Sequence, residues 1–299
     1  MPIRIIAVTQ SDPGCVRDRN EDNARAYVPP TPHDDTAMLV VADGMGGYRA
    51  GDVASRLAVE TIEVELQPLF VPSSSQPTVR LHAKTAAEGE RSTVVLPETA
   101  SSEHYGGFLT RAVRRANEVI VAYGQEHREA RGLGSTVTMA VIARNRAYFA
   151  NVGDSRSYLF REGVLRSITR DHSLVARLVE AGEIEPDDVY THPKRNLIYR
   201  SLGTDRDEVE VDLFEEEMFP GDMLLLCSDG LWEKVRTPEI ISILQEEANL
   251  TVACTKLIAL ANANGGEDNI TLVLARCQGT RDADIAEVDT GELATTQGK

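Results

Sequence analysis

The chain has 299 residues, of which 42% are hydrophobic and 26% are charged, so it carries enough apolar material for a sizeable core. Its 47 acidic and 31 basic residues give a formal net charge of −16, which disfavours nucleic acid and anionic membrane surfaces as partners, because both attract clustered Lys and Arg. No run of apolar residues approaches the roughly 18–20 that a membrane span needs.

The cysteines and the first residues bear on the compartment. Cys15, Cys227, Cys254 and Cys277 are scattered without C-x-x-C spacing, so neither a disulfide framework nor a thiolate zinc site is indicated. The first residues lack the long apolar stretch of a signal peptide. We therefore expect a cytoplasmic protein without a membrane partner.

Short apolar segments bounded by turn residues predict β-strands along the whole chain. In chain order they are 3–9, 37–42, 135–143, 146–151, 155–160, 164–169, 209–214, 222–227 and 270–277. Two of the connections, Arg144-Asn145 and Arg161-Glu162-Gly163, are very short. Because such short connections join antiparallel neighbours, we expect largely antiparallel sheets.

Longer stretches with apolar residues on one face predict helices over 51–66 and 107–128. Thr237-Pro238 is expected to supply the N-cap and first-turn proline of a third helix. A following helix through Leu257 is expected to stop at Gly265-Gly266. Strands in runs followed by helices in pairs favour an α+β layered sandwich over a doubly wound parallel sheet.

Residues 1–277 are predicted to form a single domain. Within it, residues 71–106 lack a steady hydrophobic period and contain a Ser- and Pro-rich stretch, which predicts a low-complexity loop insertion or a locally disordered segment. Residues 278–299 are rich in Asp and Glu and are predicted to be a flexible, solvated tail, with a regulatory role as the weaker alternative.

Two Asp-Gly pairs follow fully apolar runs. Asp43-Gly44 comes after residues 38–42, and Asp229-Gly230 comes after residues 223–227. Asp-Gly is also the preferred two-residue hairpin turn, so a plain turn is the alternative reading. A carboxylate at the mouth of a buried strand is partly removed from water, which is costly unless a counter-charge lies beside it. A bound cation is the counter-charge we expect.

Further acidic turns extend this pattern: Glu21 and Asp22 stand before a polar segment, Asp154 lies between two predicted strands, and Asp268 precedes the last one. Oxygen ligands without paired histidines favour magnesium or manganese over zinc.

Arg17 lies four residues before Glu21 and could grip a phosphate with its bidentate fork, although a plain salt bridge with Glu21 or Asp22 is the alternative. Together with the carboxylates it describes a two-metal site for phosphate hydrolysis.

Seven motifs occur in an order that resembles a known family. They are Arg17-x-x-Asn20-Glu21-Asp22, Asp43-Gly44-Met45-Gly46-Gly47, Gly134-Ser135-Thr136, Val152-Gly153-Asp154-Ser155-Arg156, Asp171-His172-Ser173, Ser228-Asp229-Gly230-Leu231 and Asp268-Asn269-Ile270-Thr271. This set resembles the bacterial branch of the metal-dependent serine/threonine protein phosphatases, the protein phosphatase type 2C family. The resemblance runs from about residue 5 to residue 277.

The resemblance implies a four-layer αββα sandwich, in which two mainly antiparallel sheets are flanked by helices and hold two Mn²⁺ or Mg²⁺ ions in a cleft between them. It implies that Asp43 bridges the two tightly bound ions and that Gly44 offers its carbonyl to one of them. Asp229 and Asp268 would complete the other ion's shell.

The remaining site residues also take their roles from the resemblance. Glu21 and Asp22 would act mainly through metal-bound water, and Arg17 would hold the substrate phosphate. Asp154 with Asp229 would form a weaker third metal site. Residues from about 171 to 205 would be the flap beside the active site.

The implied reaction is hydrolysis of phosphoserine and phosphothreonine by a hydroxide that bridges the two ions. The substrates would be phosphorylated proteins that a serine/threonine kinase produces, and a monomer is expected. One alternative is a catalytically silent phosphoprotein-binding or sensory module, which the presence of Asp43, Asp229 and Asp268 disfavours. A two-metal nuclease is disfavoured by the charge of −16.

One position departs from the family pattern. Members of this branch usually carry His after Asp-Gly-Met-Gly-Gly, where this chain has Tyr48. A phenol is a poorer proton donor near neutral pH than an imidazolium, so lower activity or a shifted pH dependence is expected.

Overall fold

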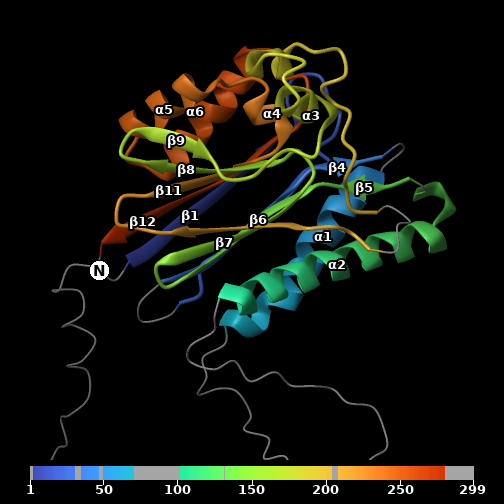
Figure 1. Ribbon diagram of the computed structural model, residues 1–299, viewed down its shortest axis with the longest axis horizontal. Helices are drawn as coiled ribbons and strands as arrows, with labels where there is room; N and C mark the ends of the chain where they lie inside the picture. Colours follow the sequence, from blue (N-terminus) through green and yellow to red (C-terminus); the bar gives the residue numbers. More distant parts are fainter. Residues whose placement is uncertain are drawn as a thin grey trace, which may run out of the picture.

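The computed structural model describes residues 3–30, 35–46, 50–70, 102–130, 132–203 and 208–279. In these residues two five-stranded sheets lie face to face, and helices cover their outer faces (Figure 1). The predicted four-layer α+β sandwich is confirmed.

The first sheet has the strand order β1-β12-β11-β8-β9, and every pairing in it is antiparallel. Its strands are β1 (Ile3–Asp12), β12 (Ile270–Gly279), β11 (Met223–Cys227), β8 (Arg156–Arg161) and β9 (Val164–Ser167). The β8–β9 turn has Glu162 and Gly163 at φ values of 50° and 81°, as a tight two-residue hairpin requires.

The second sheet has the order β10-β7-β6-β3-β2 and is also antiparallel throughout. Its strands are β10 (Asp212–Glu217), β7 (Arg146–Val152), β6 (Val137–Ala143), β3 (Thr36–Ala42) and β2 (Asn23–Tyr27). A short pair, β4 (Gly44–Met45) and β5 (Gly134–Ser135), extends beyond it. The prediction of antiparallel sheets is therefore confirmed.

The central strands are apolar without alternation because both of their faces are buried. In β3, Met38 and Val40 belong to the core under the helices, whereas Leu39 and Val41 belong to the core between the sheets. The strands of a sheet buried on both faces lose the usual alternation of apolar and polar residues. This double burial explains why residues 38–42 form one apolar run.

Helices complete the two outer layers. The second sheet is covered by α1 (Ala50–Leu66) and α2 (Ser102–Glu126), and the first by α4 (Asp229–Trp232), α5 (Thr237–Glu246) and α6 (Leu250–Ala263). A further helix, α3 (Leu174–Glu180), and the 3-10 turns η1 (Gln67–Phe70), η3 (Arg128–Ala130) and η4 (Pro186–Tyr190) lie in connections. Among the helices described here, none has the length and apolar character needed to cross a bilayer.

The structure corrects some predicted boundaries. The last residues of the insertion predicted at 71–106 belong to α2, which begins at Ser102. Tyr105 in this first part of the helix stacks on Tyr148 with ring centroids 4.4 Å apart. The rest of that segment, 71–101, lies outside the described residues. The first two residues of the tail predicted over 278–299 belong to β12, which runs to Gly279, and residues 280–299 lie outside the described residues. The N-cap of α5 is Arg236 rather than Thr237, with Pro238 in the first turn.

The predictions for β2 and β10 were wrong, because contacts with neighbouring elements stabilise these two strands. The polar strand β2 was not predicted; its Arg25 forms an ion pair with Glu63 of α1 at 2.9 Å. The strand predicted at 209–214 lies three residues later, and its Glu216 pairs with Arg166 of β9 in the other sheet, with 2.8 Å between Arg166 Nη2 and Glu216 Oε1. Neither ion pair can be predicted from a local sequence pattern, because its two partners are far apart in the chain.

Candidate active site

The predicted acidic residues come from strand ends that meet at one end of the sandwich. In the second sheet, the start of β2 pairs with the end of β3, Asn23 opposite Ala42. In the first sheet, the end of β11 lies opposite the start of β12, with Cys227 paired to Leu272. Antiparallel pairing therefore brings together loops that are far apart in the chain.

Electrostatics show that the aspartates form one cluster. The pKa of Asp43 lies well above its usual range, first because of burial and then because of repulsion from Asp22, Asp229, Asp154 and Asp268. The pKa of Asp229 is also raised well above its usual range by burial, and next by Asp154 and Asp268. The charges of the neighbouring aspartates thus disfavour the ionised forms of Asp43 and Asp229, as expected where a cation is required.

Asp22 is held by residues whose roles the sequence did not indicate. Its carboxylate is buried, which raises its pKa to about 6. Ser228 Oγ donates a hydrogen bond of 2.7 Å to Asp22 Oδ2 and accepts one of 3.0 Å from the Thr271 amide. Ser228 and Thr271 both lie in the quoted motifs, and that is the signal that could have identified them.

One buried carboxylate oxygen has no hydrogen-bond partner among the residues that the structure describes. Asp229 Oδ1 is buried without a hydrogen bond, which is costly for a charged group. Beside the cluster, a Cβ added to Gly44 would lie 2.1 Å from the Gly51 carbonyl oxygen and 2.4 Å from that of Glu21. Only glycine fits there, because any larger residue would place its Cβ against these two backbone oxygens. An unpaired oxygen among mutually repelling carboxylates fits a metal ion.

The spacing of the acidic side chains limits which ligands could surround a metal ion at this cluster. Within the described parts of the chain, no three His, Cys, Asp or Glu side chains form a group that could hold a metal ion by themselves. Mg²⁺ commonly uses one or two carboxylates and keeps several waters, so a shell of carboxylates, a backbone carbonyl and water remains compatible with this site.

Arg17 lies beside the cluster but pairs with a different residue than predicted. Its Nη2 donates a hydrogen bond of 2.7 Å to Asp268 Oδ2, and its side chain is 51% exposed. The alternative prediction of a salt bridge to Glu21 or Asp22 is therefore wrong in its partner. The guanidinium stays within electrostatic range of Glu21, whose pKa is raised mainly by burial.

Asn269 fixes the segment that carries Glu21. Its Oδ1 accepts a 2.8 Å hydrogen bond from the Glu21 amide, and its Nδ2 donates to the carbonyls of Pro13 at 3.0 Å and Arg19 at 2.8 Å. Ser55 Oγ donates to the Glu21 carbonyl at 2.5 Å. Neither residue was predicted to belong to the site.

Asp154 is buried in the same cluster, and its pKa is raised to about 7 by burial and next by Asp171. The loop before it is tied to the start of the predicted flap, because the Gly153 amide donates a 2.9 Å hydrogen bond to His172 Nδ1. The described part of this predicted flap, residues 171–203, returns to the candidate site through Leu202, whose amide donates to the Ser135 carbonyl at 2.8 Å. Tyr48 lies outside the described residues.

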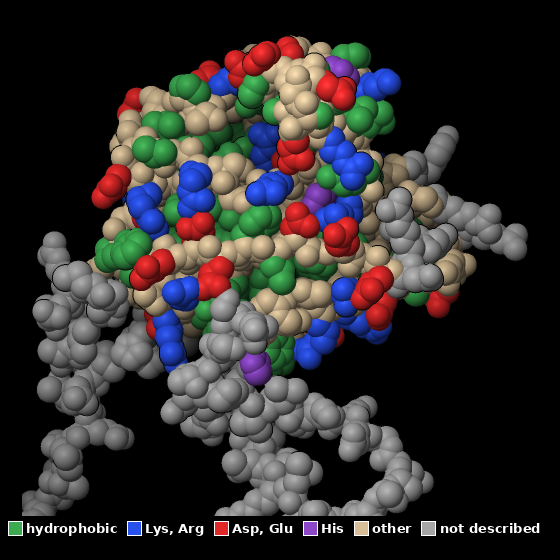
Figure 2. Space-filling model, viewed as in Figure 1, with side chains coloured by type: hydrophobic (Ala, Val, Ile, Leu, Met, Phe, Trp, Pro, Cys, Tyr) green, Lys and Arg blue, Asp and Glu red, His purple; other side chains and the backbone are tan. Residues whose placement is uncertain are grey.

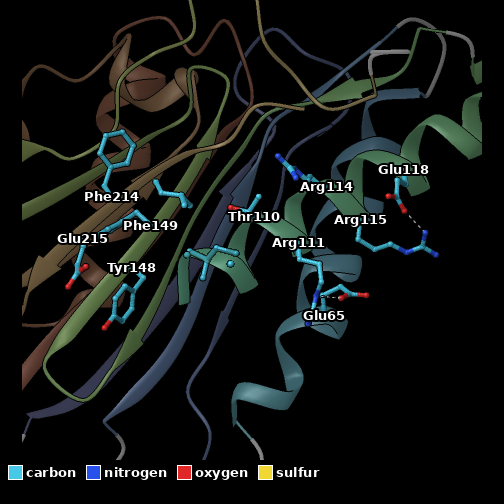
Figure 3. A pocket seen from close by; sticks show the side chains of 14 residues that line it. Glu65, Thr110, Arg111, Arg114, Arg115, Glu118, Tyr148, Phe149, Phe214 and Glu215 are labelled. Carbon is cyan, nitrogen blue, oxygen red and sulfur yellow. Dashed lines mark hydrogen bonds and ion pairs between the residues drawn. The ribbon is translucent and has the colours of Figure 1, made fainter. Parts of the chain in front are cut away.

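A pocket of about 900 Å³ lies elsewhere, between α2 and the strands β7 and β10 (Figure 3). None of the predicted site residues lines it. Its Arg111, Arg114 and Arg115 each have an ion-pair partner, which is Glu65, Glu208 or Glu118 respectively. The carboxylate cluster, where the pKa values of the aspartates are raised, therefore remains the candidate active site.

Known proteins resemble this chain over most of its length. The family model described as Protein phosphatase 2C matches residues 19–257. The serine/threonine phosphatase stp of Listeria monocytogenes serotype 4b (strain F2365) is 36% identical over 265 residues, which cover 89% of this chain and 93% of that protein.

Solved structures agree with the sequence matches. The crystal structure of the Mycobacterium tuberculosis serine/threonine phosphatase PstP/Ppp has a TM-score of 0.72 and 34% identity, and the match covers 93% of this chain and 100% of that one. The catalytic domain of PstP in complex with 2 manganese ions has a TM-score of 0.70 and 32% identity, with coverage of 93% and 100%. The chain therefore belongs to the protein phosphatase 2C family, and it is a protein serine/threonine phosphatase.

Proposed function

We propose that the chain hydrolyses phosphoserine and phosphothreonine with two tightly bound Mn²⁺ or Mg²⁺ ions and a weaker third. Asp43 would bridge the two tight ions, with the Gly44 carbonyl on one and Asp229 and Asp268 on the other. Asp154 would join Asp229 at the weaker site. Glu21 and Asp22 would act through bound water.

The observation that carries this proposal is the buried, unpartnered Oδ1 of Asp229 within a cluster of mutually repelling aspartates. Buried carboxylates otherwise take up protons or acquire a counter-ion. The structure of the PstP catalytic domain in complex with manganese supports the choice of metal. A catalytically silent module would have no need for this strained arrangement.

The ions would supply a hydroxide nucleophile at neutral pH and neutralise charge on the phosphoryl oxygens. The residues of this chain would position the carboxylates and the substrate phosphate. Ser228 holds Asp22 through a hydrogen bond, and Asn269 holds the backbone at Glu21. Arg17 is half-exposed beside the cluster, so its fork can move from Asp268 to a substrate phosphate.

Phosphorylated proteins made by a serine/threonine kinase are the proposed substrates, and the cytoplasm is the proposed location, with a monomer as the acting form. Figure 2 shows basic and acidic side chains interspersed over one face of the molecule. Together with the net charge of −16, such a face gives no support to the alternative of a nuclease, which needs clustered Lys and Arg.

The test is phosphate release from a phosphothreonine peptide. We expect release with Mn²⁺, none after treatment with EDTA, and recovery when Mn²⁺ is added back. Plasmid DNA and an oligonucleotide serve as control substrates and should stay intact. Full activity in EDTA would overturn the metal mechanism, while peptide binding without turnover in saturating Mn²⁺ would favour the silent module.

A further inference from the structure

Trp232, the only tryptophan of the chain, is the last residue of α4, the short helix that begins at Asp229 of the acidic cluster. Its side chain is 3% exposed and packs in the core under α5 and α6. Its indole Nε1 donates a buried hydrogen bond of 3.0 Å to the backbone carbonyl of Asp154. The bond fixes the backbone of a residue in the acidic cluster.

The face of the same indole ring holds the start of the flap. The guanidinium carbon of Arg156 lies 3.5 Å from the ring centroid, a close cation–π contact. Arg156 is also paired with Asp171, with 2.6 Å between Nη2 and Oδ2, and both side chains are largely buried. Because Asp171 is the first residue of the flap, the ring supports the ion pair that anchors this end.

Two later residues of the flap, Tyr190 and Arg195, contact Trp232 and the residue that follows it. The ring centroids of Tyr190 and Trp232 are 6.2 Å apart, and Arg236 lies 3.3 Å from the Tyr190 centroid. Arg195 Nε is 3.1 Å from Oε2 of Glu233, the residue after Trp232. The flap is thus held at two separated points by Trp232 and its neighbours.

We propose that Trp232 is a positioning residue, which keeps Asp154 and the flap in a fixed relation so that metal binding at Asp154 and substrate contact at the flap are coupled. Trp232 touches neither substrate nor metal in this scheme and acts through Asp154, Arg156 and Tyr190. The inference rests on the proposed function, since it takes Asp154 as a ligand of the weaker metal.

A spectroscopic test follows from the single tryptophan. In the wild-type protein, Mg²⁺ should change the tryptophan emission with a midpoint above that of the tight sites, which calorimetry measures separately. Asp154→Asn should lose this emission change while keeping the tight calorimetric sites. The same emission change in Asp154→Asn, or no change in the wild type, would overturn the coupling.

A kinetic test separates positioning from stability. Trp232→Phe keeps a ring but removes the N–H donor, so kcat should fall about three- to tenfold, as expected for one hydrogen bond, and the Mg²⁺ needed for half-maximal activity should rise. Trp232→Leu removes the ring as well, and KM for the phosphopeptide should then also rise, because the flap loses its support.

The matched control is Ile240→Val, which removes one methyl group from a buried residue of α5 in the same core and leaves the hydrogen bond and ring contacts of Trp232 in place. It should lower the melting temperature without changing the Mg²⁺ requirement or KM. Equal kinetic changes in Ile240→Val at an equal loss of melting temperature would overturn the positioning role. Wild-type activity that persists in EDTA would instead overturn the proposed function itself, whereas a metal-dependent enzyme with unaltered Trp232→Phe kinetics would overturn this inference alone.

Discussion

At the residue scale, the aspartates of the site are kept where their charged forms are unfavourable. Asp22 and Asp154 are buried, and their pKa values are raised to about 6 and about 7. Burial and the neighbouring carboxylates also raise the pKa values of Asp43 and Asp229 well above their usual range. Active sites commonly keep such strained groups at a cost in stability, so substitutions here should separate stability from activity.

Asp43→Asn is predicted to raise the stability of the metal-free protein while it lowers activity. One repelling charge is lost from the cluster, so the metal-free variant at pH 8 should melt a few °C higher than the wild type, about 2–4 °C for each kcal/mol relieved. Phosphatase activity should fall at least about 100-fold, and the rise in melting temperature on adding Mn²⁺ should largely vanish, because the bridging carboxylate is gone.

Thermal melts with and without Mn²⁺, alongside phosphopeptide turnover, check this expectation. Glu162→Gln, which changes an exposed residue in the β8–β9 turn, is the control and should alter neither quantity. Wild-type turnover in Asp43→Asn would rule out the bridging role.

Arg17→Ala is predicted to lower kcat/KM about ten- to a hundredfold, the cost of roughly 1.5–3 kcal/mol for a lost charge-assisted contact to phosphate. Metal affinity should stay the same or become tighter, because the Arg17–Asp268 bond no longer competes with the ion for that carboxylate. Arg17→Lys should recover only part of the activity, since an ammonium lacks the planar fork.

Measuring manganese affinity, melting temperature and kcat/KM on one preparation distinguishes the two roles of Arg17. A variant with weaker metal binding and a lower melting temperature, but unchanged KM, would mark Arg17 as a structural partner of Asp268.

At the scale of elements, the short strand β4 and the start of α1 lie in backbone contact. A Cβ at Gly44 would come within 2.1 Å of the Gly51 carbonyl oxygen, and no flexible side chain can yield there. Gly44→Ala is therefore predicted to destabilise the protein by about 1–3 kcal/mol and to reduce activity sharply, because the Glu21 segment must shift.

Gly107→Ala in α2 is the matched control. Nothing lies within 4 Å of the added Cβ, and the residue is exposed within a helix. Alanine should stabilise the protein here by about 0.5–1 kcal/mol and leave activity unchanged. Denaturant melts compare the two variants, and equal effects would contradict the steric argument at Gly44.

At the scale of the whole molecule, stability should depend on pH and metal together. Because the pKa values of Asp22 and Asp154 are raised to about 6 and about 7 in the fold from an ordinary 3.8, the metal-free folded protein binds more protons than the unfolded chain between these values. Its stability must then fall as the pH rises through this window. A bound cation favours the ionised forms and offsets the loss.

EDTA is therefore predicted to lower the melting temperature more at pH 8 than at pH 5.5. Melts at both pH values, with EDTA or Mn²⁺, test this, and the Asp154→Asn variant should show a smaller difference between them. An equal effect of EDTA at the two pH values would contradict the assignment of these carboxylates to the metal site.

The sequence alone determined the class of fold and the identity of the acidic residues, because both depend on local patterns. A strand buried on both faces reads as an apolar run, as in residues 38–42, and an acidic turn after it is visible without any partner. The order of the motifs then led to the family, which the comparisons confirmed. The roles of the individual site residues and the single domain over 1–277 stay predictions.

Only the tertiary structure decided how these residues are held. Arg17 and Asp268 are 251 positions apart, and Ser228 and Asp22 are 206 apart. The carbonyl that Trp232 holds lies 78 positions before it. Hydrogen bonds between such distant residues follow from the register of two antiparallel sheets and from their stacking, which bring the strand ends to one place; no local sequence pattern carries that information.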